Sequence, residues 1–212
     1  MQPVAEPARK AVRARLRTDY SVHRAARLEA DRLAGELLFD ENAWIREFAR
    51  QRSRTLGATD FAERYRFNLS TWAQDSASGV LLGLMETGTS TDAKLTVTFL
   101  RAPHKKTRIA ALRATHALAG AEAEGPLLDA LASSSRALSA LARNFLRGSR
   151  NADTTSKLVA LVDSPHAHVS ANALRLVHDA DKWTGLLIAL RLRSDDDVAV
   201  ARHAKNDSQL VA

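Results

Sequence analysis

Hydrophobic positions recur along the chain with a period of 31 residues, and each period contains two apolar registers. The first register holds Ile45, Ser76, Thr107, Leu138, Val169 and Val200. Four places after these stand Ala49, Val80, Ala111, Ala142, Ala173 and Ala204. The second register holds Leu38, Leu69, Leu100, Leu131 and Val162, with Leu192 one place short of the sixth position. A period between 20 and 50 residues is typical of an array of repeated units.

Within each period the apolar residues follow the three-and-four spacing of amphipathic helices. The first helix of one unit contains Leu127, Leu128 and Leu131, and the next unit repeats this pattern. The second helix carries one broad stripe, formed by Leu138, Leu141, Ala142, Phe145 and Leu146. The pattern therefore predicts two helices per unit, with small residues where neighbouring helices approach closely.

Turn signals fall in phase with these registers. Five residues before the first register stand Asp40, Thr71, Ala102, Ser133, Ser164 and Asp195. Most of these have a side-chain oxygen, so we predict N-caps at these positions. Pro103 and Pro165 follow directly, at the predicted first helical position, where a missing N–H costs little. The segment from Gly83 to Thr91 is rich in Gly, Thr and Ser, and we expect a longer turn there.

The pattern resembles a short HEAT repeat of the phycobilin lyase type, within the armadillo-type superfamily. In DENAWIREFA, Asp40, Ile45, Arg46 and Ala49 match the family's aspartate, valine–arginine pair and alanine. At the arginine position, later units carry Arg108, Ser139 and Ser170. The resemblance covers residues 20–204 and implies an all-α fold, a right-handed α-solenoid of about six HEAT-like helix pairs.

We predict one solenoid domain over residues 19–205, preceded by a basic cap or tail over 1–18 and followed by a polar tail over 206–212. Composition agrees, because Gly and Pro are sparse and aromatic residues make up only 5% of the chain. There is no cysteine, which excludes disulfides and thiolate chemistry. No apolar run approaches the length of a membrane span or signal peptide, so we expect a cytoplasmic protein.

The formal net charge is +7, which favours attraction to polyanions and acidic surfaces. The excess lies mainly between Arg101 and Arg150, where nine basic residues face three acidic ones.

The repeat also predicts a polar ladder on successive second helices. Its members are Gln51, Arg54, Arg113, His116, Asn144, Arg147, Arg175 and His178. Leu82 and Met85 occupy the same two positions in one unit, and the two positions are three residues apart, on one helical face. The resemblance places second helices on the concave side, so it implies a basic groove. Lys105, Lys106 and Arg136 would add charge at the helix ends; a solvated face without a ligand is the alternative.

These features favour a non-enzymatic scaffold or adaptor that binds an acidic or helical segment of a partner protein. The alternative is a nucleic-acid-binding protein, including one that resembles the HEAT-like alkylpurine DNA glycosylases. In that family tryptophans and an aspartate act at the lesion, and the candidates here are Trp72 with Asp75, or Trp183 with Asp179 and Asp181. A lyase acting on a bilin is a third possibility, which rests on repeat type alone.

No phosphate loop, nucleophile elbow or other catalytic motif occurs, and we expect no cofactor. His166 and His168 are the closest histidine pair, but no second ligand cluster accompanies them, so we expect no metal site. The run Asp195, Asp196 and Asp197 is interpreted as a negative first turn of a helix.

Overall fold

The computed structural model describes residues 24, 28–29, 31–71, 77–147 and 152–192, and within them the regular structure is all helical, without a strand. Residues 31–37 form a first helical segment. The α-helices that follow are α2 (Ala43–Thr55), α3 (Phe61–Thr71), α4 (Ser78–Thr87), α5 (Ala93–Val97), α6 (Lys105–Ala119), α7 (Glu124–Leu131), α8 (Arg136–Leu146), α9 (Ala152–Val162), α10 (Ala167–Ala180) and α11 (Lys182–Leu192). Short 3-10 turns are η2 (Ser90–Asp92), η3 (Thr98–Arg101) and η4 (Gly120–Ala123).

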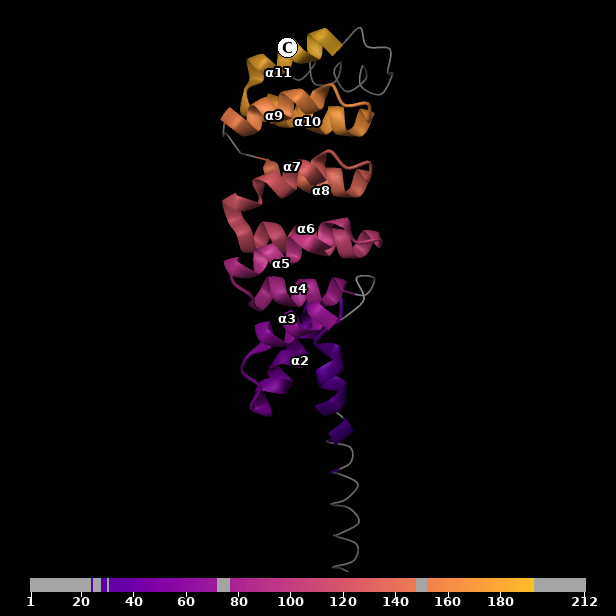
Figure 1. The fold of residues 1–212 in the computed structure, drawn as a ribbon, viewed down its shortest axis with the longest axis vertical. Helices are drawn as coiled ribbons and strands as arrows, with labels where there is room; N and C mark the ends of the chain where they lie inside the picture. Colours follow the sequence, from indigo (N-terminus) through magenta and orange to yellow (C-terminus); the bar gives the residue numbers. More distant parts are fainter. Residues whose placement is uncertain (1–23, 25–27, 30, 72–76, 148–151, 193–212) are drawn as a thin grey trace, which may run out of the picture.

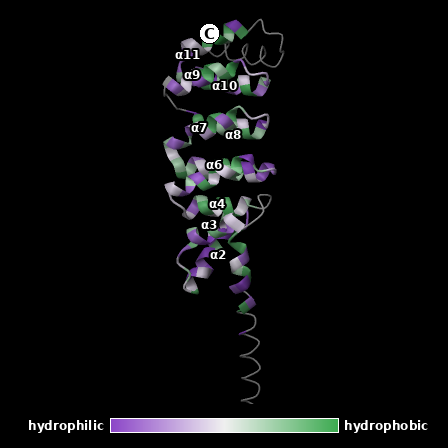
Figure 2. Ribbon diagram, viewed as in Figure 1, coloured by the Kyte–Doolittle hydropathy of each residue, from purple (hydrophilic) through white to green (hydrophobic). Residues whose placement is uncertain are grey.

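The helices follow one another along the long axis of the molecule in sequence order (Figure 1). Helices α2, α4, α6, α8 and α10 form one row, since each contacts the next in this list. Helices α3, α5, α7 and α9 each pack against the helix that follows in the chain. Both hydrophilic and hydrophobic positions occur along these helices (Figure 2), as expected where one face is buried.

Burial follows the predicted registers. The described members of the alanine position, Ala49, Val80, Ala111, Ala142 and Ala173, are all 0% exposed. In the second register, Leu38, Leu69, Leu131, Val162 and Leu192 are buried, while Leu100 is half-buried in η3. Ser76, Val200 and Ala204 lie outside the described residues. Small side chains at this fully buried alanine position allow close contact between neighbouring helices of the row α2 to α10.

The N-cap positions predicted at Asp40, Ala102, Ser133 and Ser164 lie two residues before the observed ones. Thr71 is instead the last residue of α3, and Ala77 precedes α4, while Asp195 lies outside the described residues. Helix α2 is capped by Asn42, whose side chain accepts from the Trp44 amide at 2.9 Å. Asp40 instead accepts from the Asn42 amide at 2.7 Å. Such a side-chain bond to the amide two residues on builds a turn, which needs its own residues before the helix begins.

The same turn recurs before α8 and α10. The hydroxyl of Ser133 accepts from the Ser135 amide at 3.2 Å, and that of Ser164 accepts from the His166 amide at 3.3 Å. Because α6 begins at Lys105 and α10 at Ala167, Pro103 and Pro165 lie before the helices and not at their first positions.

The segment from Gly83 to Thr91 is not one long turn, because α4 extends through Gly83 to Thr87. A Cβ added at Gly83 would lie 2.2 Å from Cε1 of Tyr65. Tyr65 is buried, and its hydroxyl donates to the Leu38 carbonyl at 3.0 Å. The glycine therefore serves close packing of α3 on α4, and the turn proper begins only at Gly88.

Within the described part of the chain, no helix is long and apolar enough to cross a membrane. The predicted tails over 1–18 and 206–212 lie outside the described residues.

Candidate binding surface

The polar ladder lies on α2, α6, α8 and α10, which belong to the row of helices in mutual contact. Its exposed members are Gln51, Arg54, Arg113, Asn144 and Arg147, and its half-buried members are His116, Arg175 and His178. Lys105 and Arg136, at the starts of α6 and α8, are exposed as well.

The α2 end of the ladder is bound to a carboxylate of its own helix. Glu47 accepts from Nε2 of Gln51 at 3.3 Å and from Nη1 of Arg54 at 3.2 Å. Hydrogen bonds from Arg50, and also from Arg54, lower the pKa of Glu47, which keeps it charged. On α4 the ladder positions hold half-buried Leu82 and Met85. The uninterrupted polar part of the ladder is therefore confined to α6, α8 and α10.

Helices α6 and α8 are joined at the ladder by a ring contact. His116 stacks on Phe145 with ring centroids 4.1 Å apart and an interplanar angle of 19°. Nδ1 of His116 is buried and has no hydrogen-bond partner. The stack fixes the imidazole against α8, so His116 presents the apolar face of its ring there.

Between α8 and α10 stands Arg143, a residue that the sequence analysis missed. Its Nη1 donates to Oδ1 of Asn172 at 3.3 Å and its Nη2 donates to Oδ1 of Asn144 at 3.2 Å. Its Nε is buried without an acceptor. Asn172 in turn donates from Nδ2 to the hydroxyl of buried Ser139 at 2.8 Å. These acceptors are neutral amides, so the guanidinium is held in position without being neutralised.

Other arginines surround Arg143. Burial lowers the pKa of Arg143, and the positive charges of Arg175 and Arg147 lower it further, whereas Asp179 acts in the opposite direction. Oδ2 of Asp179 lies 4.0 Å from Nε of Arg147, which is too far for a hydrogen bond, and the Asp179 side chain is 49% exposed. Among the described residues, Asp179 is therefore the one carboxylate that acts on Arg143 in this group of arginines.

The repeat register explains how Arg143 could have been found. Positions 31 residues apart hold Arg50, Leu81, Leu112, Arg143 and Leu174. The three leucines are buried, so an arginine at this position is a charged group in a core register. The signal was present in the sequence, although the registers chosen for the polar ladder did not include this position.

Arg50, the other arginine in this register, is fully compensated. Nη1 of Arg50 donates to Glu86 at 2.6 Å and its Nε donates to Glu47 at 2.9 Å. Although burial lowers the pKa of Arg50, its hydrogen bonds, the one to Glu86 foremost, raise it overall. Glu86 follows Arg50 by 36 residues, and Asp179 follows Arg143 by the same number. Asp179 is one methylene shorter, and it forms no hydrogen bond to Arg143.

A hollow of about 190 Å³ lies between α4 and α6, beside Arg113. Its lining residues are Glu41, Ser78, Leu82, Lys106, Ile109, Ala110 and Arg113. Glu41 accepts from Nζ of Lys106 at 3.1 Å and from the Ser78 hydroxyl at 2.7 Å. Lys106 is thus paired with an acidic group, while the adjoining wall combines apolar side chains with the guanidinium of Arg113.

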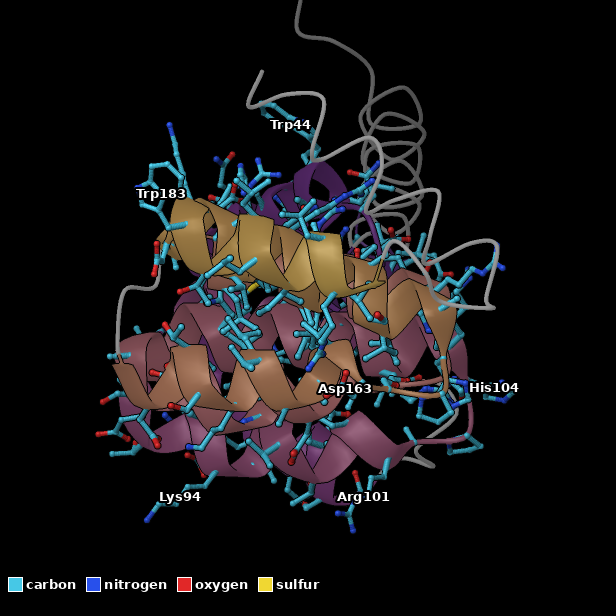
Figure 3. All side chains as sticks on the ribbon, turned by 90° about the horizontal axis from the view of Figure 1, so that it is seen from above. Trp44, Lys94, Arg101, His104, Asp163 and Trp183 are labelled. Carbon is cyan, nitrogen blue, oxygen red and sulfur yellow. The ribbon has the colours of Figure 1, made fainter. Side chains whose placement is uncertain are left out.

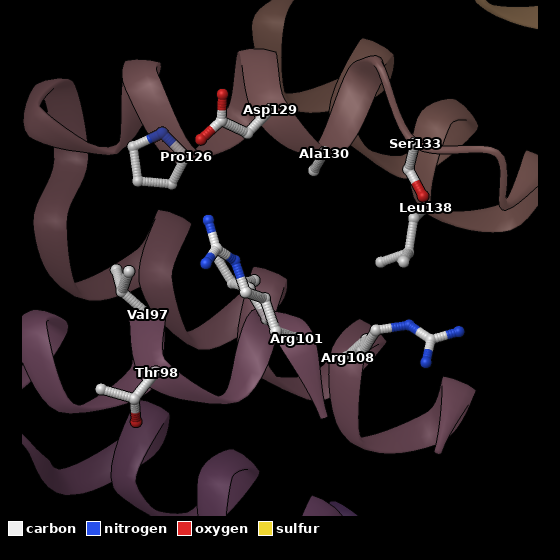
Figure 4. Close-up of a pocket in the computed structure, with 10 residues that line it drawn as sticks. Val97, Thr98, Arg101, Arg108, Pro126, Asp129, Ala130, Ser133 and Leu138 are labelled. Carbon is white, nitrogen blue, oxygen red and sulfur yellow. The ribbon is translucent and has the colours of Figure 1, made fainter. Parts of the chain in front are cut away.

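A second hollow, of about 690 Å³, lies between η3, α6 and α7 and contains no ladder residue (Figure 4). Arg101 extends into it towards Pro126 and Asp129 (Figure 4). Nη1 of Arg108 donates to the carbonyls of Ala102 and Pro103, both at 2.7 Å, and so stabilises the turn before α6. This hollow brings opposite charges together and does not concentrate one sign.

Of the candidate glycosylase residues, the structure describes Trp183, Asp179 and Asp181. Asp181 accepts from the Thr184 hydroxyl at 2.6 Å and from the Trp183 amide at 3.0 Å, and these bonds, that of Thr184 foremost, lower its pKa. It is therefore used in the turn that starts α11. The Trp183 side chain is 75% exposed and projects away from that helix (Figure 3). Trp72 and Asp75 lie outside the described residues.

The closest histidine pair, His166 and His168, forms contacts with nearby groups of the chain. The rings of His166 and His168 stack with centroids 5.8 Å apart, and Nε2 of His168 lies 3.0 Å from the Ser133 carbonyl. No group of three or more potential ligand side chains occurs among the residues that the structure describes. The run 195–197 lies outside them.

Comparison of the chain with protein-family models, with curated proteins and with solved structures gives no significant match.

Proposed function

We propose that the chain is a non-enzymatic scaffold or adaptor that binds an acidic, helical segment of a partner protein across α6, α8 and α10. The observation that carries this proposal is the pair of guanidiniums of Arg143 and Arg147, which face the single carboxylate of Asp179 among the residues that the structure describes. An excess of charge of one sign on a surface attracts a partner of the opposite sign and orients it.

The chemistry of the neighbouring surface favours a protein segment over nucleic acid. Beside Arg113 the hollow between α4 and α6 presents Leu82 and Ile109, which suit an apolar side chain. An amphipathic helix could insert such a side chain there and direct its carboxylates towards the arginines. A phosphate backbone would instead favour a longer row of cations, and the α2 end of the ladder is already bound to Glu47.

The proposed architecture is a right-handed solenoid of HEAT-like helix pairs, with α2, α4, α6, α8 and α10 as the second helices. The row of contacts between these helices and the burial of the repeated alanines support it. In such an array each unit stacks on its neighbours, so one binding surface extends over several units.

The test is a binding titration by fluorescence anisotropy across a salt series. The probes are a labelled amphipathic helical peptide with one leucine face and one glutamate face, duplex DNA, single-stranded DNA and structured RNA. The variant combines Arg113→Glu, Arg147→Glu and Arg175→Glu. The control combines Arg64→Glu, Lys94→Glu and Arg101→Glu, which changes the net charge equally at exposed positions outside the ladder.

The proposal requires that the wild type and the control bind the acidic peptide, and that the ladder variant binds it about 10- to 100-fold more weakly. Tighter binding of DNA or RNA than of the peptide, lost in the ladder variant, would mean that the surface is a phosphate-binding track. Equal loss in the ladder and control variants would show that only net charge matters, which contradicts the proposed surface.

A further inference from the structure

Arg143 has hydrogen-bonding capacity that the described part of the chain does not use. A guanidinium carries five N–H groups. Two of those of Arg143 donate to the amide oxygens of Asn172 and Asn144, and its buried Nε–H has no acceptor. The side chain is held from both sides by these amides, so the remaining Nη hydrogens are fixed in direction.

At Arg50, carboxylates of the same chain accept the hydrogen bonds of the guanidinium. There Glu86 and Glu47 supply carboxylate oxygens at 2.6 Å and 2.9 Å. At Arg143 the residue in the position of Glu86 is the shorter Asp179, which lies towards Arg147. Among the described residues, Arg50 therefore has hydrogen-bonded carboxylates, and Arg143 has none.

Retaining a cation in a core register is costly unless an anion compensates it. The neighbouring units fill this position with buried Leu112 and Leu174. An isolated guanidinium between α8 and α10 would be less favourable than a leucine there. Guanidinium groups bind the paired oxygens of carboxylates and phosphates in a bidentate manner.

We infer that Arg143, with Arg147 beside it, forms an oxyanion-binding site between α8 and α10 that takes one carboxylate or phosphate group of the partner. This inference rests on the proposed function for the identity of the partner, but the site itself can be tested alone. Asn144 and Asn172 are positioning residues, because they hold the guanidinium through their amide oxygens.

The experiment measures thermal unfolding of the full chain in increasing sodium phosphate or sodium acetate, with sodium chloride at equal ionic strength as the reference. Two variants remove the site differently. Arg143→Leu restores the leucine of the register. Asn172→Asp places a carboxylate of the chain against Nη1 of Arg143, and the Ser139 hydroxyl can then donate to it. Arg101→Leu, at an exposed position in η3 outside the site, is the control.

For the wild type and the control we expect the oxyanion to raise Tm by about 3 °C at ten times its dissociation constant, relative to chloride. Both site variants should lose this rise while unfolding at a Tm no lower than that of the wild type. A rise with phosphate alone, or with acetate alone, identifies which oxyanion the site accepts.

The inference is wrong if neither oxyanion raises the wild-type Tm above chloride, or if both site variants keep the rise. If Arg143→Leu fails to fold, Asn172→Asp alone decides between these outcomes. Peptide binding separates this inference from the proposed function. If a site variant loses the oxyanion response but the wild type binds no acidic peptide, the oxyanion site is supported and the proposed function is contradicted. A site variant that loses the oxyanion response but binds the peptide as tightly as wild type would show that the peptide does not use the site. That result contradicts the inference that the site takes a group of the partner, and it leaves the proposed function standing.

Discussion

Replacing Glu86 by glutamine removes the carboxylate that two buried arginines share. Nε of Arg46 donates to Glu86 at 3.1 Å and Nη1 of Arg50 donates at 2.6 Å, while Nη2 of Arg46 forms an ion pair with its other oxygen. The Arg46 side chain is 2% exposed. Glutamine has the same shape but no charge, and its amide nitrogen would face guanidinium donors.

The expected loss of stability follows from this burial. Removing one partner of a buried ion pair costs about 3–5 kcal/mol. Because the Glu86 side chain is 21% exposed, water can enter beside it, and we expect the lower part of that range, about 3 kcal/mol. A chain of this size typically has about 5–15 kcal/mol of stability, so the variant should fold but unfold at much lower denaturant concentration.

The assay is urea unfolding at pH 7 followed by circular dichroism at 222 nm. Asp179→Asn is the matched control, since Asp179 occupies the equivalent position after Arg143 but is exposed and forms only a 4.0 Å contact. We expect it to cost less than about 1 kcal/mol. Equal effects of the two substitutions would show that Glu86 does not compensate buried charge.

Three further substitutions test the packing and the ion pairs. Gly83→Ala should cost about 1–3 kcal/mol in urea unfolding, because its Cβ would lie 2.2 Å from the Tyr65 ring; an unchanged midpoint would contradict that packing. Ala142→Leu should cost a similar amount, since Ala142 is 0% exposed between α8 and its neighbours, and a stabilised variant would contradict close contact there. The hydrogen bond from Arg66 lowers the pKa of Asp92, so its contribution is present above the unfolded value near 3.8 and is lost as pH falls through the folded value. Urea midpoints measured from pH 6 to pH 2.5 should therefore fall less steeply for Asp92→Asn than for wild type, and parallel curves would show that the pair does not contribute.

Hydrophobic periodicity predicted the helical class and the buried positions, because the apolar face of a helix has to be covered whatever the sequence of its turns. Ala111 and Ala173 illustrate this, since both are fully buried. The starts of α2, α6, α8 and α10 were predicted two residues too early. A serine or aspartate oxygen can bond the amide of the second following residue as well as it can cap a helix, and the sequence does not distinguish the two.

Charge compensation could not be predicted from the ladder positions alone. Arg54 and Arg147 occupy equivalent places in the repeat, yet Arg54 is bound to Glu47 of its own helix whereas Arg147 lies among other arginines. Whether a carboxylate reaches a guanidinium depends on one methylene and on the rotamer, as Glu86 and Asp179 show. Gly83 was misinterpreted for a similar reason, since the requirement for a missing side chain comes from Tyr65 on another helix.

The most direct test of the central claim is a charge exchange between the ladder and its peptide. The variant carrying Arg113→Glu, Arg147→Glu and Arg175→Glu is titrated with the leucine–glutamate peptide and with a leucine–lysine peptide of the same length. We expect the variant to lose the acidic peptide and to bind the basic one with an affinity close to that of the wild type for the acidic peptide. A variant that still binds the acidic peptide as tightly as wild type would show that the surface of α6, α8 and α10 is not where the partner binds.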